Sequence, residues 1–592
     1  MHRDAPPSHG HSLRGASRDV RARSIRIAGR RSGTRPRTAS RRGPTHTRRD
    51  AARRRRQVHC RCRRLDAPSR RIARRERTLG RPRCRRSRAH RGRTSLQPPL
   101  HDRSSGTRQP QCGGRRRRSR RAGGVRNHRC RNSPRHRVAR RPRSHANRNF
   151  RVDRAPAAGT RRQVASRSMT TLWTPRVDAV ESSNMHRFLT LMGAVDTDAA
   201  RRVALADQGE FWSAVWDFCG MQGERGNRAS LVRESGPRGT SYFPDARLNV
   251  VDTLLQVREG DTTRDAIIEV DETGNRRTTT WGDLRHEVAV VTAALRNDGV
   301  GPGHRVAAWM PNVRETVVLF LAAMEIGATF TSTSADFGAH GVLERFGQTA
   351  PTVLLASSHY SYAGKRIDLT DTLAQIRAEL PGLVRTVVVG ECPDDATPWA
   401  DYRGVAADGP RPRFDFDHPG TILYTSGTTG KPKCIVHRAA GVLLMHLKEQ
   451  QLHCDVRRGD RVFYFTTCGW MMWNWLVSML ASGATIVLYD GSPTHPRIDH
   501  LWDLCESERF TLFGTSAKYI DAMKKNGVEP RSARDLSALR TVCSTGSPLA
   551  PDGFDWVHQQ LGDVHLASIS GGTDLCGCFV GGGPAKPVRR GE

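Results

Sequence analysis

The amino-acid composition changes abruptly at Met169, and this change decides which part of the chain can fold. Residues 1–168 contain 55 Arg, no Lys and seven acidic residues, and Phe150 is their one aromatic side chain. A segment so poor in apolar side chains cannot bury enough surface to offset the entropy of the chain. Residues 169–592 contain 43 basic and 50 acidic residues in an ordinary globular composition. We therefore expect a disordered Arg-rich leader over 1–168 and a folded part after it.

Arginine clusters, such as those at residues 53–56 and 115–118, allow three interpretations of the leader. They would bind nucleic-acid phosphates without sequence specificity. They are also a feature of organelle-targeting segments, which are rich in Arg and poor in acids. Finally, Arg without Lys is typical of GC-rich codons read outside their frame or ahead of a true start. We favour this last interpretation, a mis-called start before Met169, and expect no specific nucleic-acid partner.

Residues 470–489 form an uncharged run of twenty, which is long enough to cross a bilayer. Ser482 and Gly483 divide it into an apolar helix and a β-rich segment, so we expect a buried helix followed by a buried strand and no membrane span. The five cysteines of the leader show no paired zinc-ligand spacing, and the nine after Met169 are scattered, with nothing that resembles a secretory signal followed by a disulfide framework. We expect reduced thiols and a cytoplasmic protein.

Helical and strand patterns alternate along residues 169–592. Leu284, Val288, Val291 and Leu295 recur at helical spacing, and Thr280 with Asp283 forms a capping pair ahead of them. A strand at 305–310, a helix at 313–326 and a strand near 328–331 follow. Further strands are expected at 352–356, 385–389, 421–424, 461–466, 485–489, 511–514 and 540–543. This alternation predicts a large α/β domain with parallel sheets.

The strongest chemical signal is the decapeptide at residues 424–433, Tyr-Thr-Ser-Gly-Thr-Thr-Gly-Lys-Pro-Lys. It follows an expected strand and precedes an expected helix near Arg438. Two glycines allow close approach of backbone N–H groups, three hydroxyls add donors, and Lys433 adds a positive charge. Such a loop suits the phosphate tail of a nucleoside triphosphate. It lacks the Gly-Lys-Ser/Thr ending of a Walker loop.

This loop resembles the phosphate loop of the adenylate-forming acyl-CoA synthetase superfamily. Further blocks are similar to those of acetoacetyl-CoA synthetases, and they keep that family's order. They cover residues 172–175, 183–185, 211–219, 243–249, 334–338, 467–475 and 569–575. The resemblance implies an N-terminal region over 169–250 and an AMP-binding adenylation domain over 251–592, the large N-terminal domain of that α/β superfamily.

The resemblance also implies a two-step reaction that uses ATP, Mg²⁺ and CoA. Acetoacetate would attack the α-phosphorus of ATP, and the CoA thiol would then displace AMP from the acyl-adenylate. The phosphate loop would comprise Thr425, Ser426, Gly427, Thr428, Thr429, Gly430 and Lys433, and Gly546, Ser547 and Pro548 would lie against the adenine. Thr573 would contact the α-phosphate, and Asp574 would bind the metal as a hard oxygen ligand.

The residues of the expected acyl pocket favour acetoacetate over a shorter acid as the substrate. Gly571 stands where the similar acetyl-CoA synthetases have a tryptophan that shortens the pocket, so space for a longer acyl group is expected. Trp470, Met471, Met472 and Trp473 are expected to form the remaining wall, although Met and Trp also fill protein cores. The sequence identifies no group that would bind the keto oxygen of acetoacetate.

The resemblance implies elements that cannot be located before Glu592. These are an Asp for the ribose, a hinge and a small domain with a catalytic Lys. We expect a truncated, frameshifted or split reading frame whose product binds nucleotide weakly and has little or no ligase activity. Two alternatives stay open: a ligase for another short- or medium-chain acid, and a non-catalytic protein that binds nucleotide or RNA.

Overall fold

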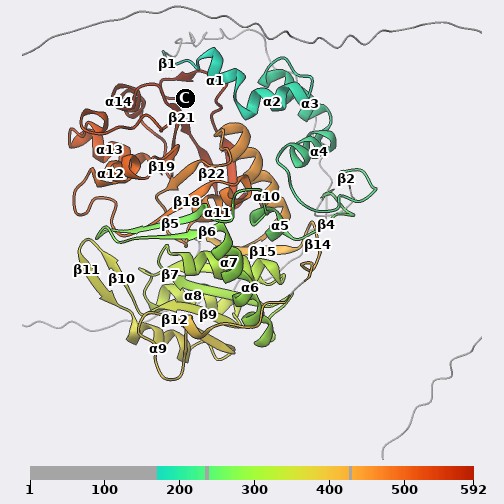
Figure 1. Cartoon of the computed structure of the whole chain (residues 1–592), viewed down its shortest axis with the longest axis vertical. Helices are drawn as coiled ribbons and strands as arrows, with labels where there is room; N and C mark the ends of the chain where they lie inside the picture. Colours follow the sequence, from blue (N-terminus) through green and yellow to red (C-terminus); the bar gives the residue numbers. More distant parts are fainter. Residues whose placement is uncertain (1–169, 234–238, 408, 426–429) are drawn as a thin grey trace, which may run out of the picture. The chain divides into compact units, whose positions relative to one another are not determined.

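The computed structural model describes residues 170–233, 239–407, 409–425 and 430–592. The chain divides into two units, Met1–Asn149 and Phe150–Glu592, and all the described residues belong to the second. Two seven-stranded sheets form the centre of this second unit (Figure 1). This architecture confirms the α/β class that the sequence predicts.

The first sheet is parallel except at one edge, where β16 runs antiparallel to β15. Its strands in spatial order are β13 (Thr397–Pro398), β12 (Arg385–Val389), β9 (Val353–Ser357), β7 (Arg305–Met310), β8 (Thr329–Ser334), β15 (Pro419–Thr425) and β16 (Lys433–Arg438). The inner strands are almost entirely buried, as expected for a parallel sheet covered on both faces.

The second sheet has the same design, with β6 antiparallel to β5 at one edge. Its strands in spatial order are β21 (His565–Ser568), β20 (Thr541–Thr545), β19 (Leu512–Ser516), β17 (Arg461–Tyr464), β18 (Thr485–Asp490), β5 (Asp265–Asp271) and β6 (Arg276–Thr280). The chain therefore begins this sheet at β5 and β6, builds the first sheet, and returns at β17.

Helices cover the sheets and build the N-terminal region. They are α1 (Val177–Glu181), α2 (Asn184–Leu191), α3 (Thr197–Ala206), α4 (Gln208–Phe218), α5 (Val250–Leu254), α6 (Trp281–Asn297), α7 (Arg314–Glu325), α8 (Ala339–Thr349), α9 (Thr370–Ala378), α10 (Ala439–Leu447), α11 (Met471–Ser478), α12 (His500–Ser507), α13 (Ala517–Lys525) and α14 (Pro551–Leu561). Short 3-10 helices are η1 (Trp399–Asp401), η3 (Met479–Ser482) and η4 (Pro530–Ser532), and η2 (Lys448–His453) is a π-helical segment that continues α10.

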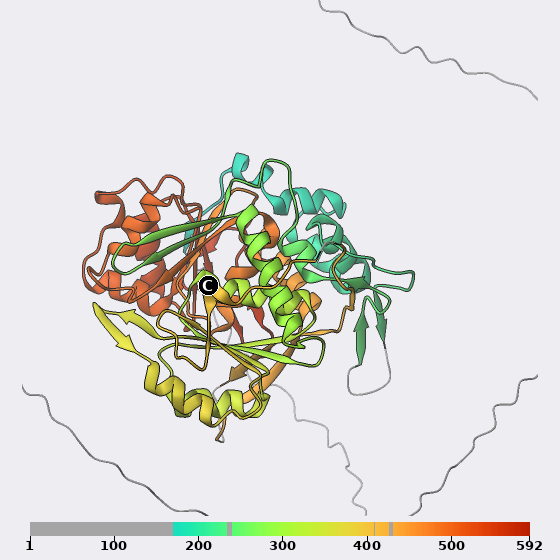
Figure 2. The same cartoon turned by 60° about the horizontal axis from the view of Figure 1, so that its bottom comes forward.

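Five two-stranded pairings complete the described secondary structure. They are β1 (Thr171–Trp173) with β24 (Val588–Arg589), β2 (Leu231–Arg233) with β3 (Thr240–Tyr242), β4 (Arg247–Leu248) with β14 (Phe414–Asp415), β10 (His359–Tyr362) with β11 (Lys365–Asp368), and β22 (Ser570–Gly572) with β23 (Gly577–Val580). The β10–β11 hairpin projects from the sheets in Figures 1 and 2, and the buried Glu272 carboxylate accepts the backbone N–H of Ala363 and Gly364 at its tip.

Local sequence signals position several of these elements as predicted. The Thr280 hydroxyl accepts the Asp283 N–H at 3.1 Å and caps α6. The uncharged run at 470–489 divides into α11, η3 and β18, with Gly483 between them at φ +72°. In the part of the chain that the structure describes, no helix has the length and apolar character needed to cross a bilayer.

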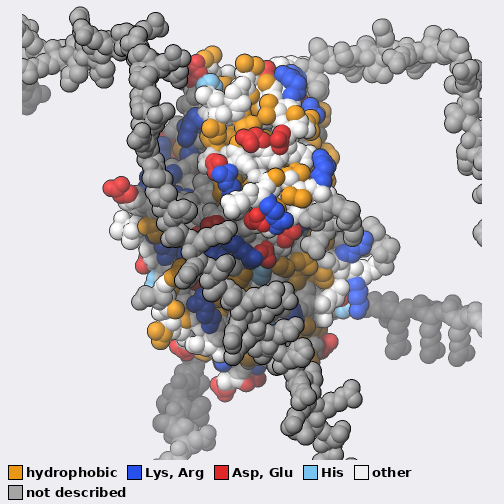
Figure 3. Space-filling model, turned by 90° about the vertical axis from the view of Figure 1, so that its right-hand side faces the viewer, with side chains coloured by type: hydrophobic (Ala, Val, Ile, Leu, Met, Phe, Trp, Pro, Cys, Tyr) orange, Lys and Arg blue, Asp and Glu red, His pale blue; other side chains and the backbone are white. Residues whose placement is uncertain are grey.

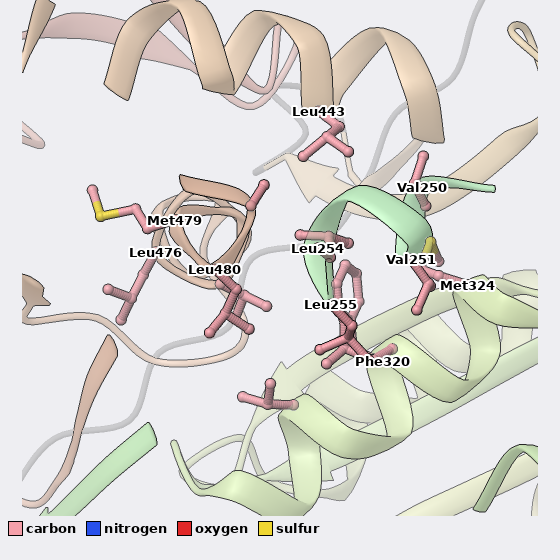
Figure 4. Packing of buried hydrophobic residues seen from close by; sticks show 14 of the residues in the cluster. Val250, Val251, Leu254, Leu255, Phe320, Met324, Leu443, Leu476, Met479 and Leu480 are labelled. Carbon is pink, nitrogen blue, oxygen red and sulfur yellow. The ribbon is translucent and has the colours of Figure 1, made fainter. Parts of the chain in front are cut away.

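The main core lies where α5, α7, α10 and α11 meet. Figure 4 shows Leu254, Phe320 and Leu443 converging there, and all three are at least nine-tenths buried. Each such side chain contributes about 1.5–3 kcal/mol relative to an exposed position. The charged side chains of the folded part are mixed, unlike those of the Arg-rich leader. The face in Figure 3 carries acidic and basic side chains together with scattered apolar ones. This packing fixes α10 and α11, the two helices behind the candidate site.

Candidate active site

The predicted phosphate loop connects two antiparallel strands. Thr425 ends β15 and pairs with Lys433, the first residue of β16. Gly430 has φ +135°, a backbone conformation that favours glycine. Ser426, Gly427, Thr428 and Thr429 lie outside the described residues. The loop therefore emerges at the carboxyl end of β15, as the sequence predicts.

A strand that the sequence did not predict separates the loop from the helix expected near Arg438. Residues 433–438 form strand β16, and α10 begins only at Ala439. Ile435 and Val436 are β-branched and favour an edge strand. The two strands that flank the loop are antiparallel neighbours, so the described residues that follow it directly form a strand and offer no helix N-terminus whose dipole could aid phosphate binding.

The predicted adenine segment leaves the carboxyl end of β20. Gly546 has φ +84°, and Ser547 is exposed. The preceding residue, Thr545, donates its hydroxyl hydrogen to the carbonyl of Ile569 at 2.9 Å. This bond ties the start of the adenine segment to the start of the β22–β23 hairpin. Ligands of parallel α/β sheets bind at such carboxyl ends.

Thr573 and Asp574 occupy the tight turn of the β22–β23 hairpin, which we call the catalytic turn (residues 573–576). Asp574 is exposed and forms no ion pair with the described residues. Cys576 has φ +53°, and its N–H bonds back to the carbonyls of Gly572 and Thr573. A single free carboxylate suits Mg²⁺, which keeps water and phosphate oxygens as its other ligands. Among the described residues, no group of three or more His, Cys, Asp or Glu side chains could hold a metal alone.

His437 on β16 lies directly behind the catalytic turn. Burial lowers the pKa of its imidazole, while a hydrogen bond to the Thr573 backbone and the charge of Asp574 act in the opposite direction. Its Nε2 is buried without a hydrogen-bond partner among the described residues. The strand after the phosphate loop and the catalytic turn are therefore in contact.

A buried polar network holds the far side of the catalytic turn. His446 on α10 is fully buried; its Nε2 lies 2.6 Å from the Cys576 carbonyl oxygen, and its Nδ1 lies 2.8 Å from the Ser478 hydroxyl. Because the carbonyl can only accept, Nε2 carries the proton. Burial lowers the pKa of His446, which keeps the ring neutral.

The π-helical segment η2 extends this network to α11. Glu449 is 4% exposed; its carboxylate accepts the Cys578 N–H at 2.9 Å and the Trp475 indole N–H at 3.0 Å. Gln450 donates to the Trp475 carbonyl and to Ser478. The sequence-based expectations missed these residues, although three polar side chains within five positions of an apolar helix were a signal. Together they fix α11 relative to the catalytic turn.

The predicted acyl-pocket residues on α11 separate into three environments. Trp470 precedes the helix and is 65% exposed, whereas Met471 and Met472 are half-buried. Trp473 is completely buried, packs on Phe320 and Phe330, and donates its indole N–H to Asn312 at 2.9 Å. Trp473 therefore belongs to the core, and only the first three remain candidates for the wall.

The structure explains why residue 571 is a glycine, and the sequence alone does not reveal this explanation. A Cβ at this position would lie 2.1 Å from the Gly577 carbonyl oxygen, across the β22–β23 hairpin. No side chain fits at that distance, so glycine is required by close backbone approach. Space for a longer acyl group does not follow from the backbone position of Gly571.

A large cavity lies away from these predicted residues. Its volume is about 750 Å³, and α2, α3, α4, η2 and residues 580–589 surround it. It contains none of the predicted nucleotide or acyl residues. The candidate site is therefore defined by the meeting of β16, the adenine segment and the catalytic turn.

Comparison with known proteins agrees with this arrangement. The AMP-binding enzyme family matches residues 256–591. The acetoacetyl-coenzyme A synthetase of Rhizobium meliloti (strain 1021) is 47% identical over 439 residues, which cover 71% of this chain and 67% of that protein. The chain belongs to the acetoacetyl-CoA synthetase family of AMP-binding enzymes. This family is one of acid–thiol ligases.

A solved structure and a second relative extend the comparison. The acetoacetyl-CoA synthetase from Streptomyces lividans matches with a TM-score of 0.69 and 40% identity, over 71% of this chain and 68% of that one. A malonamoyl-CoA synthetase of Penicillium aethiopicum is 37% identical over 66% of this chain and 59% of its own length. The chain thus spans about two thirds or less of the length of these relatives.

Proposed function

We propose that this chain provides the adenylation domain of an AMP-forming acetoacetate–CoA ligase. One observation carries the proposal: the three segments that the resemblance assigns to the nucleotide lie close together in the fold. Thr545, at the adenine segment, donates its hydroxyl hydrogen to the Ile569 carbonyl at the base of the hairpin, and the His437 side chain on β16 lies near Thr573 and Asp574. These segments all lie within the range that matches the AMP-binding family.

The acid is proposed from the chemistry of the relatives. The acetoacetyl and malonamoyl groups in the relatives' names share a carbonyl group at C3. A ligase that accepts both groups needs a pocket that holds about four heavy atoms of the acid beyond its carboxylate. The pocket also needs a hydrogen-bond donor for the C3 carbonyl. We therefore propose acetoacetate as the acid, with ATP and CoA as the other substrates.

In the proposed first step, the acetoacetate carboxylate attacks the α-phosphorus of ATP, forming acetoacetyl-adenylate and releasing pyrophosphate. The residues of this chain act by position and charge. Gly430 and Lys433 border the loop for the β- and γ-phosphates, and Thr573 faces the α-phosphate. Mg²⁺, held by Asp574, would neutralise phosphate charge. In the second step, the CoA thiol attacks the adenylate carbonyl and AMP leaves.

The test is acid-dependent release of pyrophosphate from ATP by the purified chain. We expect stimulation by acetoacetate above acetate, butyrate and a no-acid control, with AMP as the other product. Equal release with every acid, or formation of ADP and phosphate, would exclude the proposal.

The cellular location is proposed on chemical grounds alone. All nine cysteines among the described residues are free. Reduced thiols are typical of proteins in the cytoplasm. We propose a cytoplasmic location, which fractionation of cells that express the native gene would test.

A further inference from the structure

Asn474 carries a buried amide that the fold does not satisfy. Its side chain is 5% exposed, and Nδ2 has no hydrogen-bond partner among the described residues. A buried polar group without a partner is costly, so native proteins rarely keep one unless it has another use. Replacement by an apolar side chain of similar size would remove the cost. The amide therefore indicates a ligand or an ordered water.

A small cavity adjoins this amide. Its volume is about 40 Å³, and Asn474, His446, Ser478 and Thr421 contribute to its wall together with apolar side chains such as Phe320. That volume accommodates a group of about the size of one water molecule. His446 and Ser478 already bond to each other, so they present no free donor to the cavity. The Asn474 amide is thus the unsatisfied donor at this cavity.

The position of Asn474 connects the cavity with the candidate site. It lies three residues after Met471 on α11, hence one helical turn deeper along the same face as the expected acyl wall. His446, which borders the cavity, bonds to the Cys576 carbonyl of the catalytic turn. Thr421, also at its wall, pairs with His437, the residue that contacts Thr573.

We propose that the Asn474 side-chain amide binds the keto oxygen of the β-keto acid and thereby determines acid specificity. The inference rests on the proposed function. In the unliganded site, a water in the cavity would satisfy the amide, and the keto oxygen would replace that water. Butyrate has a methylene group at the same position and would leave the amide unpaired. A site built to hydrogen-bond a polar group rejects an analogue that lacks it.

The test compares binding of two stable adenylate analogues, so it requires no turnover. The probes are 5′-O-(N-acetoacetylsulfamoyl)adenosine and its butyryl counterpart, measured by calorimetry with the full chain. We expect the acetoacetyl probe to bind the wild type on the order of 10- to 100-fold more tightly. Asn474→Leu should reduce this ratio to near one, mainly by weakening the acetoacetyl probe.

A matched control separates specificity from folding. Asn312 is equally buried, but both of its amide atoms are bonded, Nδ2 to the Thr466 carbonyl and Oδ1 to the Trp473 indole. Asn312→Leu should lower the melting temperature and leave the probe ratio unchanged. Asn474→Leu should melt at or above the wild-type temperature, because Asn474 Nδ2 has no hydrogen bond to the described residues that the change could remove.

The outcomes distinguish the inference from the proposed function. Equal affinity of the wild type for both probes, or an unchanged ratio in Asn474→Leu, would overturn the role of Asn474 and leave the proposed function intact. Failure of both probes to bind the wild type would overturn the proposed function and this inference with it. A melting temperature of Asn474→Leu well below the wild type would overturn the inference by showing that the amide is structural.

Discussion

Replacement of His446 by leucine tests whether the buried network holds the catalytic turn. Leucine has nearly the volume of the imidazole but forms no hydrogen bond. The buried Cys576 carbonyl, now 2.6 Å from Nε2, would lose this partner, whereas Ser478 would keep its bonds to Gln450 and to the Trp475 carbonyl. One unsatisfied buried acceptor costs about 1–3 kcal/mol, and we expect destabilisation of about 2 kcal/mol.

Equilibrium urea unfolding, followed by tryptophan fluorescence, measures this loss. His340 is an appropriate control because its side chain is 89% exposed, and His340→Leu should change stability by no more than about 0.5 kcal/mol. His446→Leu should also bind the acetoacetyl adenylate analogue more weakly, because the turn that carries Thr573 loses an anchor. A His446→Leu protein with wild-type stability and wild-type affinity would refute the reasoning.

Three further predictions follow from the same structure. Gly571→Ala should distort the β22–β23 hairpin, because the new Cβ would lie 2.1 Å from the Gly577 carbonyl oxygen. We expect the variant to lose affinity for the acetoacetyl adenylate analogue and to keep its far-UV circular dichroism spectrum. Unchanged affinity would contradict this prediction. Asp574→Asn should abolish the Mg²⁺ dependence of ATP binding in calorimetry; an unaltered response to Mg²⁺ would remove Asp574 from the metal site. Burial lowers the pKa of His565 from 6.5 to about 4. Between pH 4 and 6.5, the imidazole is therefore protonated in the unfolded chain and neutral in the folded chain. Stability should therefore rise with pH across this window, by about 2 kcal/mol per such histidine between pH 5 and 7, and His565→Phe should flatten the profile in urea titrations.

Local signals in the sequence were sufficient for much of the fold. Some of the strands that the sequence predicts, such as β7, β9 and β18, are runs of mostly apolar residues, which burial on both faces of a parallel sheet favours. The capping pair at Thr280 is formed within four residues, so no tertiary information is needed to find it. By contrast, the sequence did not predict the edge strand β16, whereas the helix that it predicted near Arg438 begins at Ala439.

The candidate site was predictable only where residue type decides the chemistry. A glycine- and hydroxyl-rich loop after a buried strand favours phosphate binding by residue type, and for the loop at 424–433 this stays a prediction. The reason for Gly571 is different, because it depends on a carbonyl six residues away across a hairpin. Trp473 and Asn474 are adjacent but differ in their hydrogen bonds. The Trp473 indole N–H donates to Asn312, whereas the Asn474 side-chain Nδ2 has no partner among the described residues. Such differences arise from tertiary packing and not from residue type.

The central claim is that a carboxylate of acetoacetate bonds directly to the α-phosphorus of ATP. It is tested most directly with acetoacetate labelled with ¹⁸O in its carboxylate, incubated with ATP, Mg²⁺, CoA and the chain at substrate-level concentration. Mass spectrometry then locates the label. Our account predicts one ¹⁸O atom in each AMP released. Label in inorganic phosphate, or unlabelled AMP formed alongside acetoacetyl-CoA, would contradict it.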